Sequence, residues 1–234
     1  MTIAWIKTHK VIVGIAVIAA VALGSYGAYQ TYKTHEARVA LRVEREDAER
    51  LRADPKTKDA YALLEKDLKV LADAPDRVGP KFDVALDWKT LGGITGEAKY
   101  YERSVALYDE IAGILGHKSY VPYLNAGNVY RLLKKFDIAD ARYAQAKTIA
   151  PGEPAIYLAI AEMYRYELLK PSEEVLAVYR EAMGRLTEVE NILIAYASYL
   201  RDLGRTQEAI EAYEKLEKMR PGAYQSILRE LKKS

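Results

Sequence analysis

Residues 200–222 read LRDLGRTQEAIEAYEKLEKMRPG, and this stretch decides the fold class. Within it, Ala209 and Tyr213 are four residues apart and so lie on one face of a helix, and Pro221 ends the pattern. Residues 139–151 show the same Ala-x3-Tyr spacing followed by a proline, which lies 70 residues before Pro221. A helical pattern that recurs at a fixed distance is typical of a helical array, so the sequence predicts stacked helix pairs.

Tyrosine marks each period of this array. Tyr108, Tyr143, Tyr179 and Tyr213 follow one another at spacings of 35, 36 and 34 residues. The chain has 19 Tyr but only 2 Phe and 2 Trp, so the aromatic part of its core must consist largely of tyrosines. We therefore interpret these tyrosines as packing residues with a polar end, and not as a binding surface.

Each period also contains a large residue followed four positions later by a small one. The small residue lets the first helix of a pair lie close to its neighbour, and the large residue fills the space beside it. Each pair exposes an apolar face that only the next pair can cover, so a stable array needs about three or more pairs. The large residues are Trp88, Tyr123, Tyr157 and Leu193, and the small ones are Gly92, Gly127, Ala161 and Ala197.

These patterns resemble the tetratricopeptide repeat (TPR) family, whose unit of about 34 residues is two antiparallel helices. The family's first-helix pattern W-x2-L-G-x2-Y is similar to Tyr123, Ala126, Gly127 and Tyr130, and its second-helix pattern is similar to Ala139, Tyr143, Ala146 and Pro151. The resemblance implies an all-α fold, a right-handed α-solenoid over residues 81–223 with units at about 85–118, 120–153, 154–189 and 190–223. The third unit contains about two extra residues near Lys170, and residues 224–234 are predicted to form a capping helix.

The N-terminal part of the chain has a different character. Residues 11–32 contain no charged side chain and are long enough for a transmembrane helix. Trp5 and Tyr26 would stand roughly 31 Å apart along such a helix, which matches aromatic belts at the two interfaces. We predict an uncut anchor after a short tail at 1–10. The alternative is a signal peptide cleaved after Gly24 or Gly27.

Small residues recur every fourth position in this predicted span. Ala16, Ala20, Gly24 and Ala28 would form one face on which another helix could pack, either a partner's transmembrane helix or that of a second copy. Lys7 and Lys10 precede the span, and a short tail is retained in the cytoplasm more easily than it is translocated. We therefore expect the N-terminus to be cytoplasmic and the C-terminal domain to be periplasmic or otherwise extracytoplasmic, although the basic residues after the span argue for the opposite orientation.

A charged connector is predicted at residues 33–80. The segment before Asp54 lacks Pro and Gly and reads as a solvated helix. Asp54-Pro55 should break it, because a residue that precedes proline is disfavoured in the helical conformation. A second amphipathic helix follows at about 56–72, and Gly79-Pro80 marks the next predicted boundary.

The composition excludes several classes of function. A net charge of +2 provides no field for nucleic acid, and the absence of cysteine excludes disulfides, thiolate catalysis and thiolate zinc sites. Gly92–Gly96 is glycine-rich, but it follows a predicted helix and lacks the Lys-Ser/Thr of a phosphate-binding loop. We expect no catalytic residue, no cofactor and no metal site, and hence no enzyme.

The remaining candidate is a surface for a protein partner. The resemblance implies that the first helix of each unit lines the concave face of the solenoid. Arg131, Arg165 and Arg201 recur there at the period of the array and could engage the carboxylates or carbonyls of an extended peptide. Some family members grip a C-terminal carboxylate with Lys and Asn. Lys89 and Asn125 fit two of those positions, but the other positions differ, so a full clamp is not supported. The remaining candidates on this face are Asn128, Glu162 and Ser198.

Together these features predict a membrane-anchored adaptor or scaffold. The repeat domain would bind a protein segment, and the resemblance to single-span repeat proteins of bacterial inner membranes suggests envelope assembly, translocation or quality control. Two alternatives stay open. One is a permanent structural subunit of a membrane complex, and the other is a soluble secreted or periplasmic binding module released by signal cleavage.

Overall fold

The computed structural model describes residues 45–187 and 189–233. The predicted tail, the transmembrane helix at 11–32 and its packing face (Ala16, Ala20, Gly24 and Ala28) lie outside this range, so these predictions stay untested. Among the described residues, no helix is both long and apolar enough to cross a membrane. The chain divides into two compact units, and the boundary along the chain lies between Asp59 and Ala60.

In the first unit, the described helix ends at the predicted break. Residues 45–53 are helical, and the helix stops before Asp54-Pro55, as the sequence predicts. The Thr57 hydroxyl donates to the Leu51 carbonyl at 2.8 Å. This bond gives one of the open carbonyls at the helix end a partner.

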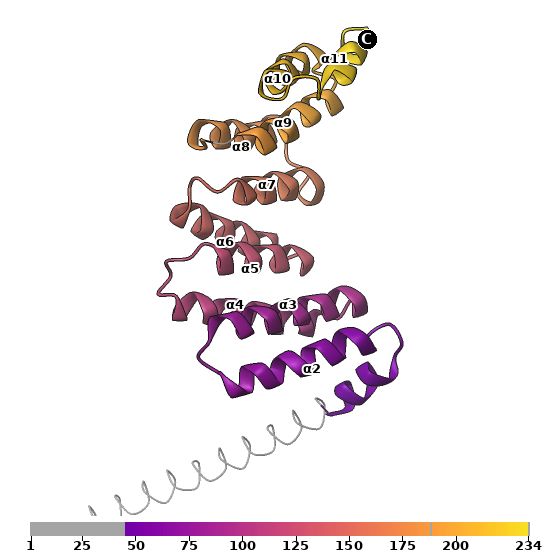
Figure 1. Ribbon diagram of the computed structural model, residues 1–234, viewed down its shortest axis with the longest axis vertical. Coiled ribbons are helices and arrows are strands. Elements are labelled where there is room, and N and C mark those ends of the chain that lie inside the picture. The colour runs from indigo at the N-terminus through magenta and orange to yellow at the C-terminus, as the bar shows by residue number, and fades with distance from the viewer. Residues whose placement is uncertain (1–44, 188, 234) are drawn as a thin grey trace, which may run out of the picture. The chain divides into compact units, whose positions relative to one another are not determined.

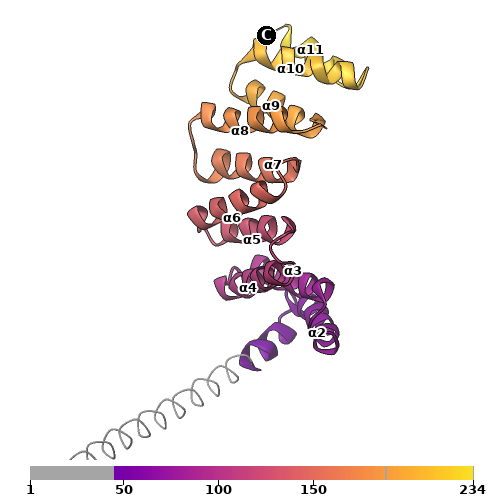
Figure 2. The same cartoon turned by 90° about the vertical axis from the view of Figure 1, so that its left-hand side faces the viewer.

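The second unit is a stack of helices that follow one another in chain order (Figures 1 and 2). All regular elements in the described residues are helical, which confirms the all-α prediction. The first helix of each of four pairs packs on its second helix, and each pair packs on the next. The bounds are α2 (Lys58–Asp73), α3 (Val78–Thr95), α4 (Ala98–Ile114), α5 (Val121–Leu132), α6 (Phe136–Ile149), α7 (Pro154–Glu162), the π-helix η1 (Met163–Glu167), α8 (Ser172–Arg185), α9 (Glu190–Asp202), α10 (Thr206–Met219) and α11 (Gln225–Leu231).

The start of α3 differs from the expected boundary. Gly79-Pro80 was predicted to separate two elements, but α3 begins at Val78 and contains Pro80 in its first turn. Proline is tolerated there because the first backbone N–H groups of a helix have no partner within the helix.

The small residues of the first helices allow the close approach that the sequence predicts. A Cβ atom added at Gly127 would fall 3.0 Å or less from three ring carbons of Tyr143. At Gly92 it would fall within 2.9 Å of the ring of Tyr101. Ala161 and Ala197, at the equivalent positions, are fully buried. The aromatic ring of each second helix thus lies directly on the backbone of its partner helix in the first two pairs.

The periodic tyrosines belong to the core, as predicted. Tyr143 is fully buried, and its hydroxyl donates to Asn128 Oδ1 at 2.8 Å. Burial raises the pKa of Tyr143 to about 12. The hydroxyl of the buried Tyr157 donates to the Pro151 carbonyl at 2.8 Å. Tyr143 of a second helix and Tyr157 of a first helix therefore both fill the core while their polar ends keep a hydrogen-bond partner.

The extra residues of the third unit are accommodated at the end of its first helix. There α7 widens into the π-helix η1, and the loop 168–171 that follows is longer than the equivalent loop 133–135 of the second unit. A π-helical turn holds more residues than an α-helical turn, so it absorbs an insertion within the helix. Tyr157 before the insertion and Tyr179 after it are both buried, so the packing of the pair is preserved.

The C-terminal helix covers the last pair. Leu228 and Leu231 of α11 are buried, and Ile227 packs against the same cluster. Arg229, Lys232 and Lys233 are exposed. Helix α11 therefore has the inward apolar and outward charged sides predicted for a solvating cap.

Candidate partner-binding face

One stripe of side chains follows each first helix. On α5 it consists of Val121, Asn125, Asn128 and Leu132, whose spacing of four, three and four residues places them on one helix face. The equivalent positions on the next pair are Ala155, Ala159, Glu162 and Tyr166. Together, these stripes on successive first helices form the first-helix face. Three of the predicted partner-binding residues, Asn125, Asn128 and Glu162, lie in them.

Two of the predicted polar candidates serve the fold. Asn128 accepts the hydrogen bond of the buried Tyr143 hydroxyl. Ser198 holds the equivalent position on α9 and is hydrogen-bonded to Tyr213. Burial raises the pKa of Tyr213, and this hydrogen bond lowers it in part. Lys89 on α3 and Asn125 on α5 are partly exposed and lie on neighbouring first helices.

Arg131 reaches from α5 to the third pair. Its guanidinium donates to Glu167 Oε1 at 2.7 Å, to Glu162 Oε2 at 3.4 Å and to the Ala159 carbonyl at 3.3 Å. Only 16% of its side chain is exposed. Burial alone would lower the pKa of Arg131, but the hydrogen bond that its guanidinium donates to Glu167 raises this pKa, so the cation is held firmly.

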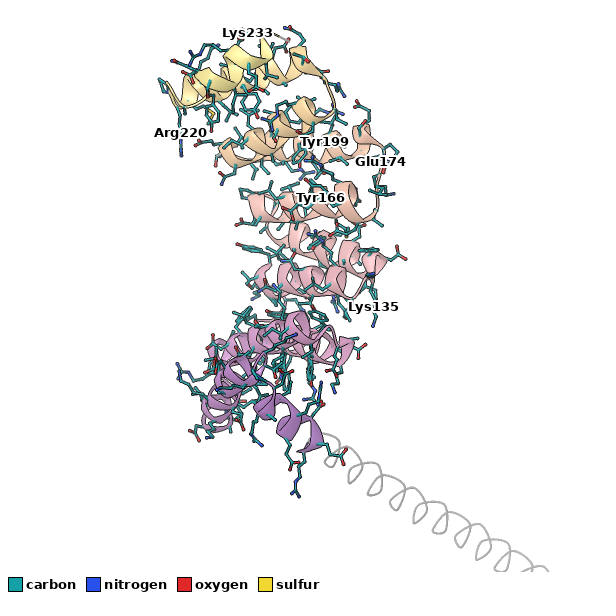
Figure 3. All side chains as sticks on the ribbon, turned by 90° about the vertical axis from the view of Figure 1, so that its right-hand side faces the viewer. Lys135, Tyr166, Glu174, Tyr199, Arg220 and Lys233 are labelled. Carbon is teal, nitrogen blue, oxygen red and sulfur yellow. The ribbon has the colours of Figure 1, made fainter. Side chains whose placement is uncertain are left out.

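Arg165 makes the same kind of connection one pair later. Its guanidinium donates to Asp202 Oδ2 of α9 at 2.6 Å. It also lies 4.7 Å from the ring centre of Tyr166 and 4.6 Å from that of Tyr199, so it sits between two aromatic rings. Figure 3 shows these two tyrosines one above the other along the stack. Arg165 is therefore fixed by contacts within the chain.

Arg201 differs from the other two arginines. It is 44% exposed, and its contact with Asp202 Oδ1 is 3.7 Å long. The sequence predicted one arginine ladder facing a ligand. The structure divides it, because Arg131 and Arg165 link successive pairs through carboxylates, and Arg201 is the more exposed member. Sequence reasoning missed Glu167 and Asp202, although they follow their arginines by 36 and 37 residues, close to the period of the array.

The second helices carry a parallel set of ion pairs at the repeat distance. Arg142 contacts Asp109 at 2.7 Å, Lys147 contacts Glu181 at 3.1 Å, and Arg205 pairs with Glu173. Each carboxylate lies on the second helix of the adjacent pair, and Arg205 lies directly before α10. Charged side chains of the array thus fix the alignment between neighbouring units.

Exposed apolar side chains recur on the first-helix face. Leu86 of α3 and Val121 of α5 hold equivalent positions and are 52% and 36% exposed. Leu132 of α5 and Tyr166 of η1 also hold equivalent positions and are 48% and 61% exposed. Each of these two positions is thus apolar and exposed in two consecutive units, which places four such side chains on one face of the first three pairs. The equivalence of Leu86 with Val121, and of Leu132 with Tyr166, follows from the repeat spacing and could have been read from the sequence.

A cavity of about 380 Å³ opens at the beginning of this face in the last two pairs. Pro154, Asn191 and Met219 line it, together with the ion pair of Glu190 and Arg220, which are 2.6 Å apart. The cavity is large enough to receive a side chain of a partner and offers it both apolar and charged walls. Within the described residues, no group of three or more His, Asp or Glu side chains is arranged to hold a metal ion.

Comparison with known proteins supports the repeat assignment. Residues 191–222 match the tetratricopeptide repeat family. A thermophilic TPR protein of Thermus thermophilus has a similar structure, with a TM-score of 0.51 over 73% of this chain and 94% of that chain, at 22% sequence identity. None of the curated proteins matches the chain. Residues 191–222 are thus similar in sequence to a tetratricopeptide repeat, and the helix pairs of this chain share the fold of a TPR protein.

Proposed function

We propose that this chain is a non-enzymatic scaffold that binds a protein segment on its first-helix face. The observation that carries the proposal is the exposure of Leu86, Val121, Leu132 and Tyr166 on that face, at two positions that are each apolar in two consecutive units. Apolar and aromatic side chains of this kind supply most of the affinity in protein interfaces. The neighbouring Arg131 and Arg165 are neutralised by carboxylates of the chain, so apolar contact contributes more to recognition than charge does.

The proposal includes a membrane anchor at residues 11–32, with the repeat domain outside the cytoplasm. Confinement to a membrane raises the effective concentration of the scaffold for a membrane-linked partner. Envelope assembly, translocation and quality control are the processes that such an arrangement suits. A permanent subunit of a membrane complex is the second candidate, and the stripe of Ala16, Ala20, Gly24 and Ala28 favours it because small residues suit contact between transmembrane helices.

Site-specific crosslinking tests the binding face. A photoreactive residue at Leu132 or Tyr166 is expected to give the same discrete adduct with a partner in cells, and Tyr166→Asp should reduce the amount of that adduct severalfold because an aromatic anchor is lost. The measurement is quantitative mass spectrometry of the crosslinked species. Ala177, exposed on α8, is the matched position on a second helix. Adducts of equal yield from Ala177 would contradict a specific role for the first-helix face.

Carbonate extraction tests the anchor. The full-length chain should remain in the membrane pellet, and a chain that starts near Lys33 should be found in the supernatant, because residues 11–32 provide the apolar length that a span requires. Intact-mass measurement distinguishes the alternatives. A mature chain in the soluble fraction that begins at Ser25 or Ala28 would support the released binding module and refute the anchor.

A further inference from the structure

A buried carboxyl lies where the first repeat meets the preceding helix. Asp87 on α3 is only 6% exposed. Its Oδ2 atom has no hydrogen-bond partner among the residues that the structure describes. A buried ionised carboxylate without a donor is costly, so an isolated carboxylate at this position would strongly disfavour the packed state.

In the later repeats, the position of Asp87 is occupied by apolar residues. Asp87 precedes the small residue Gly92 by five positions, and the equivalent residues of the later pairs are Pro122, Ile156 and Ile192. All three are buried, and both isoleucines belong to apolar clusters shared with the preceding pair. The first pair therefore has a carboxyl at the position where the others pack an apolar side chain against their neighbour.

The groups that face Asp87 are mainly acidic. The carboxyl of Asp67 on α2 lies within hydrogen-bonding reach of it, and Asp83 stands one turn earlier on α3. Two cations of α3 and α4 make contacts with other groups. Lys81 of α3 pairs with Glu110 of α4 at 2.6 Å, and the Arg103 guanidinium of α4 lies 4.5 Å from the ring centre of Trp88.

We propose that Asp67 and Asp87 share a proton across the contact between α2 and α3, and that this protonated pair holds α2 on the repeat array. A proton on either carboxyl supplies the donor that the buried oxygen lacks. When it is lost, the buried carboxylate of Asp87 faces that of Asp67, with Asp83 nearby, and α2 is released. Helix α2 lies at the N-terminal end of the helix stack (Figure 1), so its release uncovers that end of the array.

The direction of the pH dependence follows from the raised pKa of Asp87 in the docked state. Burial, together with the charge and hydrogen bond of Asp67, raises the pKa of Asp87 to about 6 from an ordinary value of 3.8. The docked state thus binds the proton more tightly than the released state. Docking is weakest above about pH 6 and strengthens as the pH falls toward 4, with a change in the docking equilibrium of roughly 100-fold for two pKa units.

Distance measurement between spin labels tests this proposal in the full-length chain. The sequence contains no cysteine, so Lys66→Cys on α2 and Ala106→Cys on α4 provide two unique and exposed labelling sites. Double electron–electron resonance should give one narrow distance at pH 5 and a broader, longer distribution at pH 8. In the Asp87→Asn variant, the amide donates the bond permanently, so the narrow distance should persist at both pH values.

Asp83→Asn is the matched control, because Asp83 is exposed and belongs to the same acidic group. That variant should retain the pH dependence of the parent chain. Circular dichroism at each pH checks that the repeat helices are intact. Distance distributions that are identical at pH 5 and pH 8 in the parent chain would overturn the proposal, and so would an undiminished pH response of Asp87→Asn.

Discussion

Replacement of Gly127 by leucine is expected to lower the melting temperature of the repeat domain by several degrees and to loosen the second helix pair. The ring of Tyr143 lies where even the first side-chain carbon of the new residue would be placed. Tyr143 is fully buried and its hydroxyl is bound to Asn128, so the ring cannot turn away without loss of packing and of a hydrogen bond. Overpacking of a close contact costs about 1–3 kcal/mol and occasionally more, and this site belongs at the upper end.

Gly113→Leu is the matched control for this prediction. Gly113 lies in α4, and an added Cβ atom meets nothing within 4 Å. The same chemical change should therefore be neutral or stabilise the helix by up to about 1 kcal/mol, because leucine is a better helix former than glycine. Thermal unfolding followed by circular dichroism compares the two variants. Equal melting temperatures would show that Gly127 is not needed for the contact between α5 and α6.

Reversal of charge at Arg131 is expected to have the second-largest effect. Arg131→Glu removes the cation between Glu162 and Glu167 and adds a third carboxylate beside them. Loss of one partner of a buried ion pair costs about 3–5 kcal/mol. Glu162 is 58% exposed, so water stabilises part of the excess charge, and we expect a loss of about 2–3 kcal/mol. Added salt should recover part of the loss because it screens the repulsion between exposed carboxylates.

Arg201→Glu separates this structural role from a general effect of charge. The substitution changes net charge by the same amount, but Arg201 is 44% exposed, and its ion pair with Asp202 is 3.7 Å long. Its effect on the free energy of unfolding should stay within about 0.5 kcal/mol. Urea unfolding of both variants provides the comparison. If Arg201→Glu were as destabilising as Arg131→Glu, the link between the second and third pairs would not be the cause.

The packing of the array could be predicted because it depends on residue size at short spacings. The pairs formed by a large and a small residue four positions apart, such as Tyr123 with Gly127, identify the inner side of a helix without knowledge of its neighbour. The periodic tyrosines were correctly placed in the core for the same reason. The amphipathic pattern of α11 likewise indicated a cap, since Leu228 and Leu231 alternate with charged residues at helical spacing.

The ion pairs between units could not be derived in the same way. Whether Arg131 meets Glu162, Glu167 or a ligand depends on how far one first helix is rotated and shifted relative to the next. Differences of a few ångströms decide that outcome, and repeat spacing does not determine them. The burial of Asp87 depends in a similar way on where α2 lies. The sequence contained a signal for it, however, since the equivalent positions in later units are Pro122, Ile156 and Ile192.

The π-helix of the third unit has a consequence for how such a protein can change in length. Because η1 and the loop after it take up the additional residues, Tyr157 and Tyr179 stay buried on either side. A small in-frame insertion in the gene is thereby confined to a single turn. That turn presents Tyr166 on the first-helix face and ends near Leu169, which is 78% exposed. A change in length at this point can therefore alter the surface offered to a partner while the framework of the array is inherited intact.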